Sequence, residues 1–142
     1  MTDINIAAAT PSGRWNVGLW FAQILLAALY AMAAWMHGVM SIDALAAMGA
    51  VWTTEAPLAL VRFIGLMEFL GVIGLILPGL TGIRPRVTIW AAIGLLAIQA
   101  LAIPFHFFRG EYPALPFNLI YAALCVFVIW GRLSKAPFST RA

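Results

Sequence analysis

With 64% hydrophobic and 9% charged side chains over 142 residues, the chain is too apolar for a soluble domain, which is typically about half apolar and a quarter charged. The formal net charge of +3 is too small and too scattered for a nucleic-acid-binding surface. A single cysteine, Cys125, excludes an internal disulfide framework and a paired-thiol redox motif. Composition therefore predicts a single integral membrane domain in contact with the lipid bilayer.

The chain begins with a polar tail, residues 1–14, that lacks the basic region of a signal peptide. No charge occurs from Trp15 to Ile42, a length beyond the ~7–15 residues of a signal-peptide core. This block predicts a retained membrane-spanning helix near 16–38. Its polar residues Gln23, Tyr30 and His37 recur every seven positions and so share one stripe of the helix.

The segment that follows, residues 39–57, is long for a hairpin and moderately apolar. We consider it a candidate interfacial helix, because Trp52 suits that depth in a membrane. Its last residues, Thr53-Thr54-Glu55-Ala56-Pro57, resemble a helix start with a threonine cap. A second spanning helix is predicted near 58–77, ending at Leu77-Pro78-Gly79.

Within this second helix, Glu68 is a lone carboxylate in the apolar run FIGLMEFLGVIG. Ten residues at ~1.5 Å each place it ~15 Å from the helix start, near the bilayer midplane. Because a carboxylate facing lipid at that depth costs several kcal/mol, Glu68 should face the bundle interior. Gly65 and Gly71 share its face and would let a neighbouring helix approach closely.

Two more spanning helices are predicted near 87–108 and 115–131. Gln99 and His106 form a polar line on the third helix, and Asn118, Tyr121 and Cys125 form one on the fourth. The fold class is therefore an all-α, four-transmembrane-helix bundle whose polar lines face inward. The membrane domain covers residues 15–132, followed by a basic tail, 133–142.

The distribution of Lys and Arg predicts the orientation. Most cations fall on one side, which should face the cytoplasm and hold both termini: Arg14, Arg84, Arg86, Arg132, Lys135 and Arg141. The other side carries Arg109 with Asp43, Glu55 and Glu111.

Glu68 is the candidate catalytic or proton-carrying residue, because acids inside membranes are functional by default. The alternative is a structural residue that is protonated or paired with Arg62, His106 or Arg109. Polar residues concentrate in the outer half of the bundle, and the candidate ligand-binding set is Arg62, His106, Arg109, Gln99, His37, Tyr30 and Tyr121. The Gln99 and tyrosine lines also suit simple interhelical contacts.

No cofactor follows from a motif. Two histidines are compatible with haem ligation, a proton relay or interfacial roles, but haem has no supporting motif. No metal site is expected, because no cluster has zinc-ligand spacing. Aromatic residues Trp52, Phe105, Phe107 and Phe108 suit an interfacial belt, and equally a headgroup-level site for a flat ring such as a quinone.

The stretch LVRFIGLMEFLGVIGLILPGLTGIRP, followed by FHFFRGE and WGR, resembles the DoxX-like family of small four-helix membrane proteins between about Leu58 and Arg132. The resemblance implies association with membrane redox complexes, including a quinone-reducing thiosulfate oxidation system and superoxide-handling enzymes, while more distant relatives act as chaperones or cargo receptors. If the family's residues matter here, they are Glu68, Arg62, His106 and Arg109.

From the residues and the resemblance together we expect a multi-pass protein of the bacterial inner membrane. Its first expected function is that of a redox-associated subunit with a quinone-like or other small hydrophobic ligand in an outer-leaflet polar pocket. The alternatives are a non-enzymatic scaffold or chaperone for a partner membrane protein, and a small proton-coupled transporter. The sequence leaves homo-oligomer formation and enzymatic activity open.

Overall fold

The structure, a computed structural model, describes residues 11–138, which are helical apart from short connections and contain no strand. Four helices are long and apolar enough to cross a membrane. They are α1 (Pro11–Val39), α3 (Leu58–Thr81), α4 (Val87–Phe108) and α5 (Leu115–Ser134). Short helices lie in the connections: α2 (Ile42–Ala47), η1 (Val51–Thr54) and η2 (Tyr112–Ala114). The predicted all-α, four-helix architecture is confirmed.

The helices are longer than predicted mainly in two places: α1 begins at Pro11, inside the predicted polar tail 1–14, and α3 continues through Pro78 to Thr81. A proline inside a helix removes one backbone hydrogen bond but does not by itself end an apolar helix. The helix ends instead at Gly82, whose φ of 71° is the left-handed conformation favoured by glycine, and whose amide donates to the Pro78 carbonyl.

The predicted threonine cap of α3 is wrong. Pro57 precedes the first helical residue, and no side chain caps the helix. Thr53 and Thr54 lie in η1, where their hydroxyls donate to the carbonyls of Ala50 and Val51, 2.8 Å away in both cases. The threonines therefore stabilise the preceding short helix.

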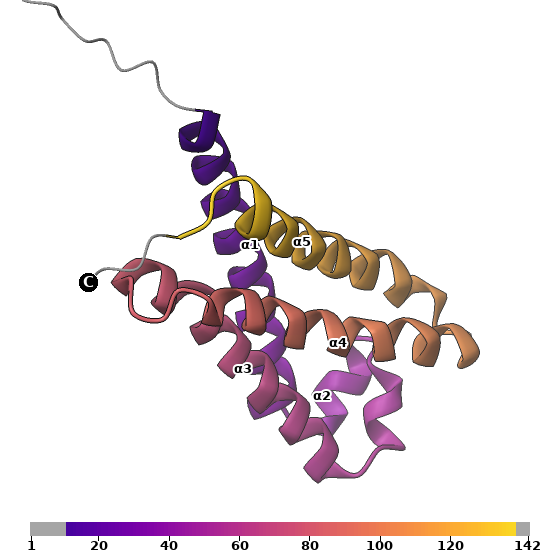
Figure 1. Cartoon of the computed structure of the whole chain (residues 1–142). Helices are drawn as coiled ribbons and strands as arrows, with labels where there is room; N and C mark the ends of the chain where they lie inside the picture. The colour runs from indigo at the N-terminus through magenta and orange to yellow at the C-terminus, as the bar shows by residue number, and fades with distance from the viewer. Residues whose placement is uncertain (1–10, 139–142) are drawn as a thin grey trace, which may run out of the picture.

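The four long helices pack in the order α1–α3–α4–α5, with α5 returning to α1 (Figure 1). We call the end of the bundle that carries the α3–α4 turn (82–86) and the end of α5 the basic end. The opposite end, where α2 and η1 lie, is the capped end. The apolar core is formed mainly by α1, α4 and α5 with Leu75 of α3.

Most of the helical surface is apolar and faces outward. Only 39% of the most apolar stretch of α1 is buried inside the bundle, and the share falls to 17% for α5. Large side chains such as Phe21, Trp90 and Leu101 are about 70% exposed or more. Such a surface is stable only against lipid. The chain is therefore a multi-pass integral membrane protein.

Backbones of α1 and α3 touch near the capped end. A Cβ atom built on Gly65 would lie 2.6 Å from the backbone nitrogen of Gly38, so only glycine fits. Gly38 is almost the last residue of α1, whereas Gly65 is more than one turn inside α3. The end of α1 therefore lies deeper in the bundle than the start of α3.

The connection 39–57 fills the space that this difference in level creates. It contains α2 and η1, with Leu45 and Thr53 buried beneath them. Ser41 caps α2 by accepting a hydrogen bond from the Ala44 amide at 3.2 Å. The candidate helix in this segment is thus present, as a short α-helix followed by a 3₁₀ turn.

Candidate functional site

Glu68 lies inside the bundle with 3% of its surface exposed, as its position in an apolar run predicts. Its Oε2 atom is 2.8 Å from Nδ1 of His37 on α1. The two side chains differ in access, because 4% of the Glu68 side chain is exposed against 18% of the His37 side chain. Of the two groups, the imidazole is therefore the more accessible.

The partner of Glu68 differs from the three predicted ones. Arg62, His106 and Arg109 were the candidates, and the structure pairs none of them with Glu68 among the described residues. If all helices ended at one level in the membrane, counting residues from the helix ends would place His37 much nearer the outer surface than Glu68. The deep Gly38–Gly65 contact removes that difference and brings the imidazole to the carboxylate.

Arg62 holds the backbone beneath His37. Its two Nη atoms donate to the carbonyl oxygens of His37 at 2.6 Å and Met40 at 2.8 Å. The last carbonyls of a helix lack intrahelical donors, and a cation there also suits the helix dipole. Arg62 is therefore a positioning residue that secures the end of α1, and each of its Nη groups donates one hydrogen bond to that end.

A second group of polar side chains lies deeper in the bundle. The Tyr30 hydroxyl donates to the Leu95 carbonyl at 3.0 Å and accepts from the Gln99 amide nitrogen at 2.8 Å. Tyr121 of α5 donates to the Leu29 carbonyl at 2.9 Å, and its ring packs edge-on against Tyr30. These contacts tie α1 to α4 and α5, the interhelical role that polar residues commonly have in membranes.

His106 and Arg109 join a separate network at the capped end. Nδ1 of His106 lies 2.6 Å from one oxygen of Glu111, and Arg109 Nε donates to the other at 3.0 Å. Arg109 also donates to Glu55 at 2.7 Å, which links the end of α4 to η1. These hydrogen bonds lower the pKa of Glu55 and raise the pKa of Arg109, so both stay charged.

Aromatic rings connect the two histidines. The Trp52 ring lies 5.7 Å from the His37 ring and 6.0 Å from Phe105, measured between centroids. The Phe105 ring lies 5.4 Å from the His106 ring, and the Arg109 guanidinium lies over the Phe105 ring, 5.3 Å from its centroid. The structure therefore brings His37, Trp52, Phe105 and His106 into one aromatic row at the capped end.

At the basic end the structure contains a polar site that the sequence analysis missed. Arg132, expected only to end the last helix, is 1% exposed. It donates to Gln23 at 2.5 Å, to Asn16 at 2.6 Å and to the Ala136 carbonyl at 3.1 Å. Gln23 in turn donates to the Leu75 carbonyl at 2.9 Å. Gln23, which belongs to α1, therefore links α1 to both α3 and α5.

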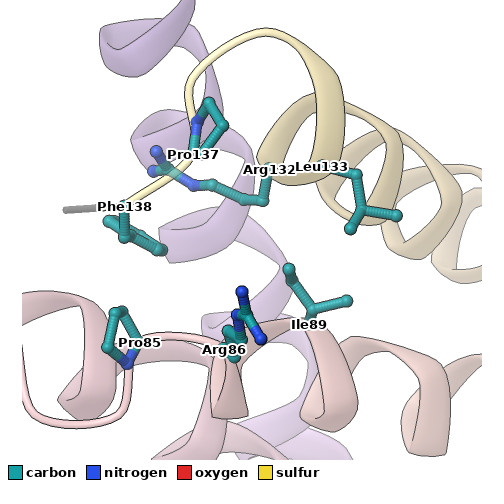
Figure 2. A pocket seen from close by; sticks show the side chains of 7 residues that line it. All are labelled: Pro85, Arg86, Ile89, Arg132, Leu133, Pro137 and Phe138. Atoms are coloured by element: carbon teal, nitrogen blue, oxygen red, sulfur yellow. The ribbon is translucent and has the colours of Figure 1, made fainter. Parts of the chain in front are cut away.

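A cavity of about 220 Å³ lies beside Arg132, between the start of α4 and the end of α5 (Figure 2). A signal for this site was present, because Gln23 heads the inward-facing stripe of α1 at this end and needs a polar partner. The expected ligand pocket was at the opposite end. Within residues 11–138 no group of three His, Cys, Asp or Glu side chains could hold a metal ion.

Four apolar spans with inward polar side chains define the class as a small helical-bundle membrane protein. The DoxX-like family model matches residues 21–128, which is most of the chain. The protein belongs to the DoxX-like family. No curated protein and no solved structure matched the chain.

Proposed function

We propose that this protein is a bacterial inner-membrane component of a redox system, in which the His37–Glu68 pair exchanges protons with a quinone-like ligand. One observation carries the proposal. A carboxylate and an imidazole lie 2.8 Å apart inside an apolar bundle, and the imidazole alone is partly exposed. Ionisable groups inside membranes are costly and commonly belong to proton or ligand paths.

The pair can hold one proton or two. With one proton, Nδ1–H of His37 donates to the Glu68 carboxylate and the pair carries a single negative charge. A second proton at Nε2 of His37 makes the pair neutral overall, which low-dielectric surroundings favour. His37 would then pass a proton outward while Glu68 keeps the imidazole in one orientation, as carboxylates do for histidines in other sites.

The aromatic row supports a flat, hydrophobic ligand. The Trp52 ring lies next to His37, and the Phe105 ring lies next to Trp52, so both offer faces and edges for stacking. His106 and Arg109 lie at the other end of the row and provide donors for a ring oxygen. Reduction of a quinone takes up two protons with two electrons, and the electrons would come from a partner protein.

In this proposal the remaining candidates have supporting roles. The hydroxyls of Tyr30 and Tyr121 already donate to backbone carbonyls, so both hold helices in place. Gln99 keeps one buried side-chain oxygen without a hydrogen-bond partner among the described residues. By the charge distribution, the capped end would face the outer leaflet and both termini the cytoplasm.

The test is extraction of the full chain in a mild detergent, followed by measurement of bound quinone. We expect about one quinone per chain, or binding of added ubiquinone to a quinone-free preparation. Trp52→Leu should weaken binding about tenfold, because an aromatic contact and its buried area together contribute about 1.4 kcal/mol. The matched control is Trp90→Leu, which removes an outward-facing tryptophan of α4 and should leave binding unchanged.

A preparation that neither retains nor binds quinone overturns the proposal. Retention of another membrane protein alone would favour the scaffold or chaperone function instead. Proton-dependent uptake of a solute into vesicles without quinone would favour the transporter. Glu68→Gln decides the role of the carboxylate, because unchanged quinone binding at every pH would leave Glu68 structural.

A further inference from the structure

Positive charge at the basic end has no matching negative charge in the described chain. Five cationic side chains gather there: Arg14, Arg84, Arg86, Arg132 and Lys135. Within residues 11–138 the carboxylates all lie in the bundle interior or at the capped end: Asp43, Glu55, Glu68 and Glu111. Most of these cations are exposed and would be solvated, but one is not.

Arg132 is buried with only neutral partners in residues 11–138. Its Nε and Nη1 atoms donate to side-chain amide oxygens and a backbone carbonyl, whereas Nη2 is buried without a hydrogen-bond partner. Its planar face rests on the Phe138 ring, 3.8 Å from the centroid. A buried guanidinium usually meets a carboxylate or phosphate through two parallel hydrogen bonds.

The neighbouring cavity contains a second guanidinium. Figure 2 shows the Arg86 side chain rising from the start of α4 toward α5, below the side chain of Arg132. Arg86 makes no side-chain hydrogen bond or ion pair with the residues that the structure describes. The walls are otherwise apolar: Pro85, Ile89, Leu133, Pro137 and Phe138.

The size of the cavity limits what it can hold. Its volume of about 220 Å³ is below the ~300–1,000 Å³ of sites that enclose drug-sized ligands. At ~30 Å³ per water, it has room for about seven waters or one small anionic group. The cavity is therefore too small to enclose a quinone ring with its substituents.

We propose that this cavity binds a phosphate group held between the guanidinium groups of Arg86 and Arg132. Two arginines match the charge and the planar donor geometry that phosphate requires. The phosphate can belong to an anionic lipid headgroup, since the site lies at the end of two spanning helices and Ile89 and Leu133 form an apolar flank. It can also be free phosphate from solution.

The experiment compares lipid and phosphate binding in nanodiscs that contain the full chain. One set holds only phosphatidylcholine, a second adds phosphatidylglycerol, and the first is also titrated with inorganic phosphate. Lipid retained by the released protein is counted by native mass spectrometry, and thermal unfolding is measured in each condition. The variants are Arg86→Gln and, as the matched control, Arg84→Gln, which removes the same charge from the same turn outside the cavity.

We expect Arg86→Gln to weaken binding about tenfold, the effect of losing a charged hydrogen bond. Arg84→Gln should weaken it by less than about twofold, because a lone exposed charge is screened. Arg132→Lys, which keeps the charge but removes the planar fork, should also weaken binding.

Binding of phosphatidylglycerol that depends on Arg86 assigns the site to a lipid headgroup. Stabilisation by inorganic phosphate with the same dependence assigns it to free phosphate, and either result supports the proposal. Equal losses in Arg84→Gln and Arg86→Gln would show only diffuse surface attraction and overturn it. So would the absence of any effect of both phosphatidylglycerol and phosphate on the wild-type chain.

Discussion

One methyl group added at Gly65 should separate His37 from Glu68 without changing either side chain. A Cβ atom there would lie 2.6 Å from the backbone nitrogen of Gly38 and 2.9 Å from the carbonyl carbon of His37. Backbone atoms cannot rotate away, so α1 must move by about 0.8 Å to reach an ordinary contact of 3.4 Å. The same movement can lengthen the 2.8 Å distance between Nδ1 and Oε2 by up to about 0.8 Å, to the limit of hydrogen-bond range.

The Gly65→Ala substitution should also lower the free energy of unfolding. Overpacking costs about 1–3 kcal/mol, and replacing glycine by alanine in a helix returns up to about 1 kcal/mol. We expect Gly65→Ala to lose about 1–2 kcal/mol in reversible unfolding in mixed micelles. Nitrogen-15 NMR of the imidazoles should show the Nδ1–H signal of His37 losing the shift caused by its hydrogen bond, while the His106 signal stays unchanged.

Gly94→Ala is the matched control, because a Cβ at Gly94 meets nothing within 4 Å. This variant should keep the His37 signal and gain stability by up to about 1 kcal/mol. If Gly65→Ala unfolds like the wild type and its His37 signal does not move, the close α1–α3 contact does not set the geometry of the pair.

Three further changes test the contacts around the site. Arg62→Gln leaves two carbonyls at the end of α1 without their donors and should cost about 1.5–3 kcal/mol of unfolding free energy; an unchanged value would mean that water replaces the guanidinium. Tyr30→Phe should cost about 1–2 kcal/mol by leaving a buried carbonyl and a buried amide unsatisfied, whereas exposed Tyr112→Phe should change it by less than about 0.5 kcal/mol. The pKa of Glu55 is lowered by Arg109, so their pairing stabilises the fold above the ordinary glutamate value of about 4.3 and is lost as the pH falls through the lower folded-state pKa. Glu55→Gln should therefore lower the unfolding temperature at neutral pH, and that temperature should fall less toward acidic pH than it does in the wild type. Identical dependence of the unfolding temperature on pH in both proteins would show that the pair contributes nothing.

The inward direction of the polar side chains could be predicted from the sequence for a physical reason. Lipid gives a polar group no hydrogen bonds, so a stripe such as Gln23, Tyr30 and His37 has only one favourable direction. Each member of that stripe is buried or nearly so, as are Glu68 and Gln99. The number of spanning helices and the first residues of most of them could be predicted for the same reason, because lipid offers the backbone no hydrogen bonds either.

The pairing of the side chains could not be predicted in the same way, because it depends on how far one helix slides along another. The sequence predicts an arginine or His106 as the partner of Glu68, yet the partner is His37, because the end of α1 lies against a residue well inside α3. Arg132 was counted with the surface cations that define orientation. Its burial depends on Asn16 and Phe138, which lie more than one hundred positions before it and just beyond the helix end.

The central claim is that Glu68 and His37 form one buried unit that takes up and releases protons. Infrared difference spectra of the protein in nanodiscs, recorded between acidic and alkaline pH, test it most directly. We predict a pH-dependent shift of a carboxylate band that is absent from Glu68→Gln, changed in His37→Gln and unchanged in the control His106→Gln. A wild-type difference spectrum with no band that depends on Glu68 would contradict the claim.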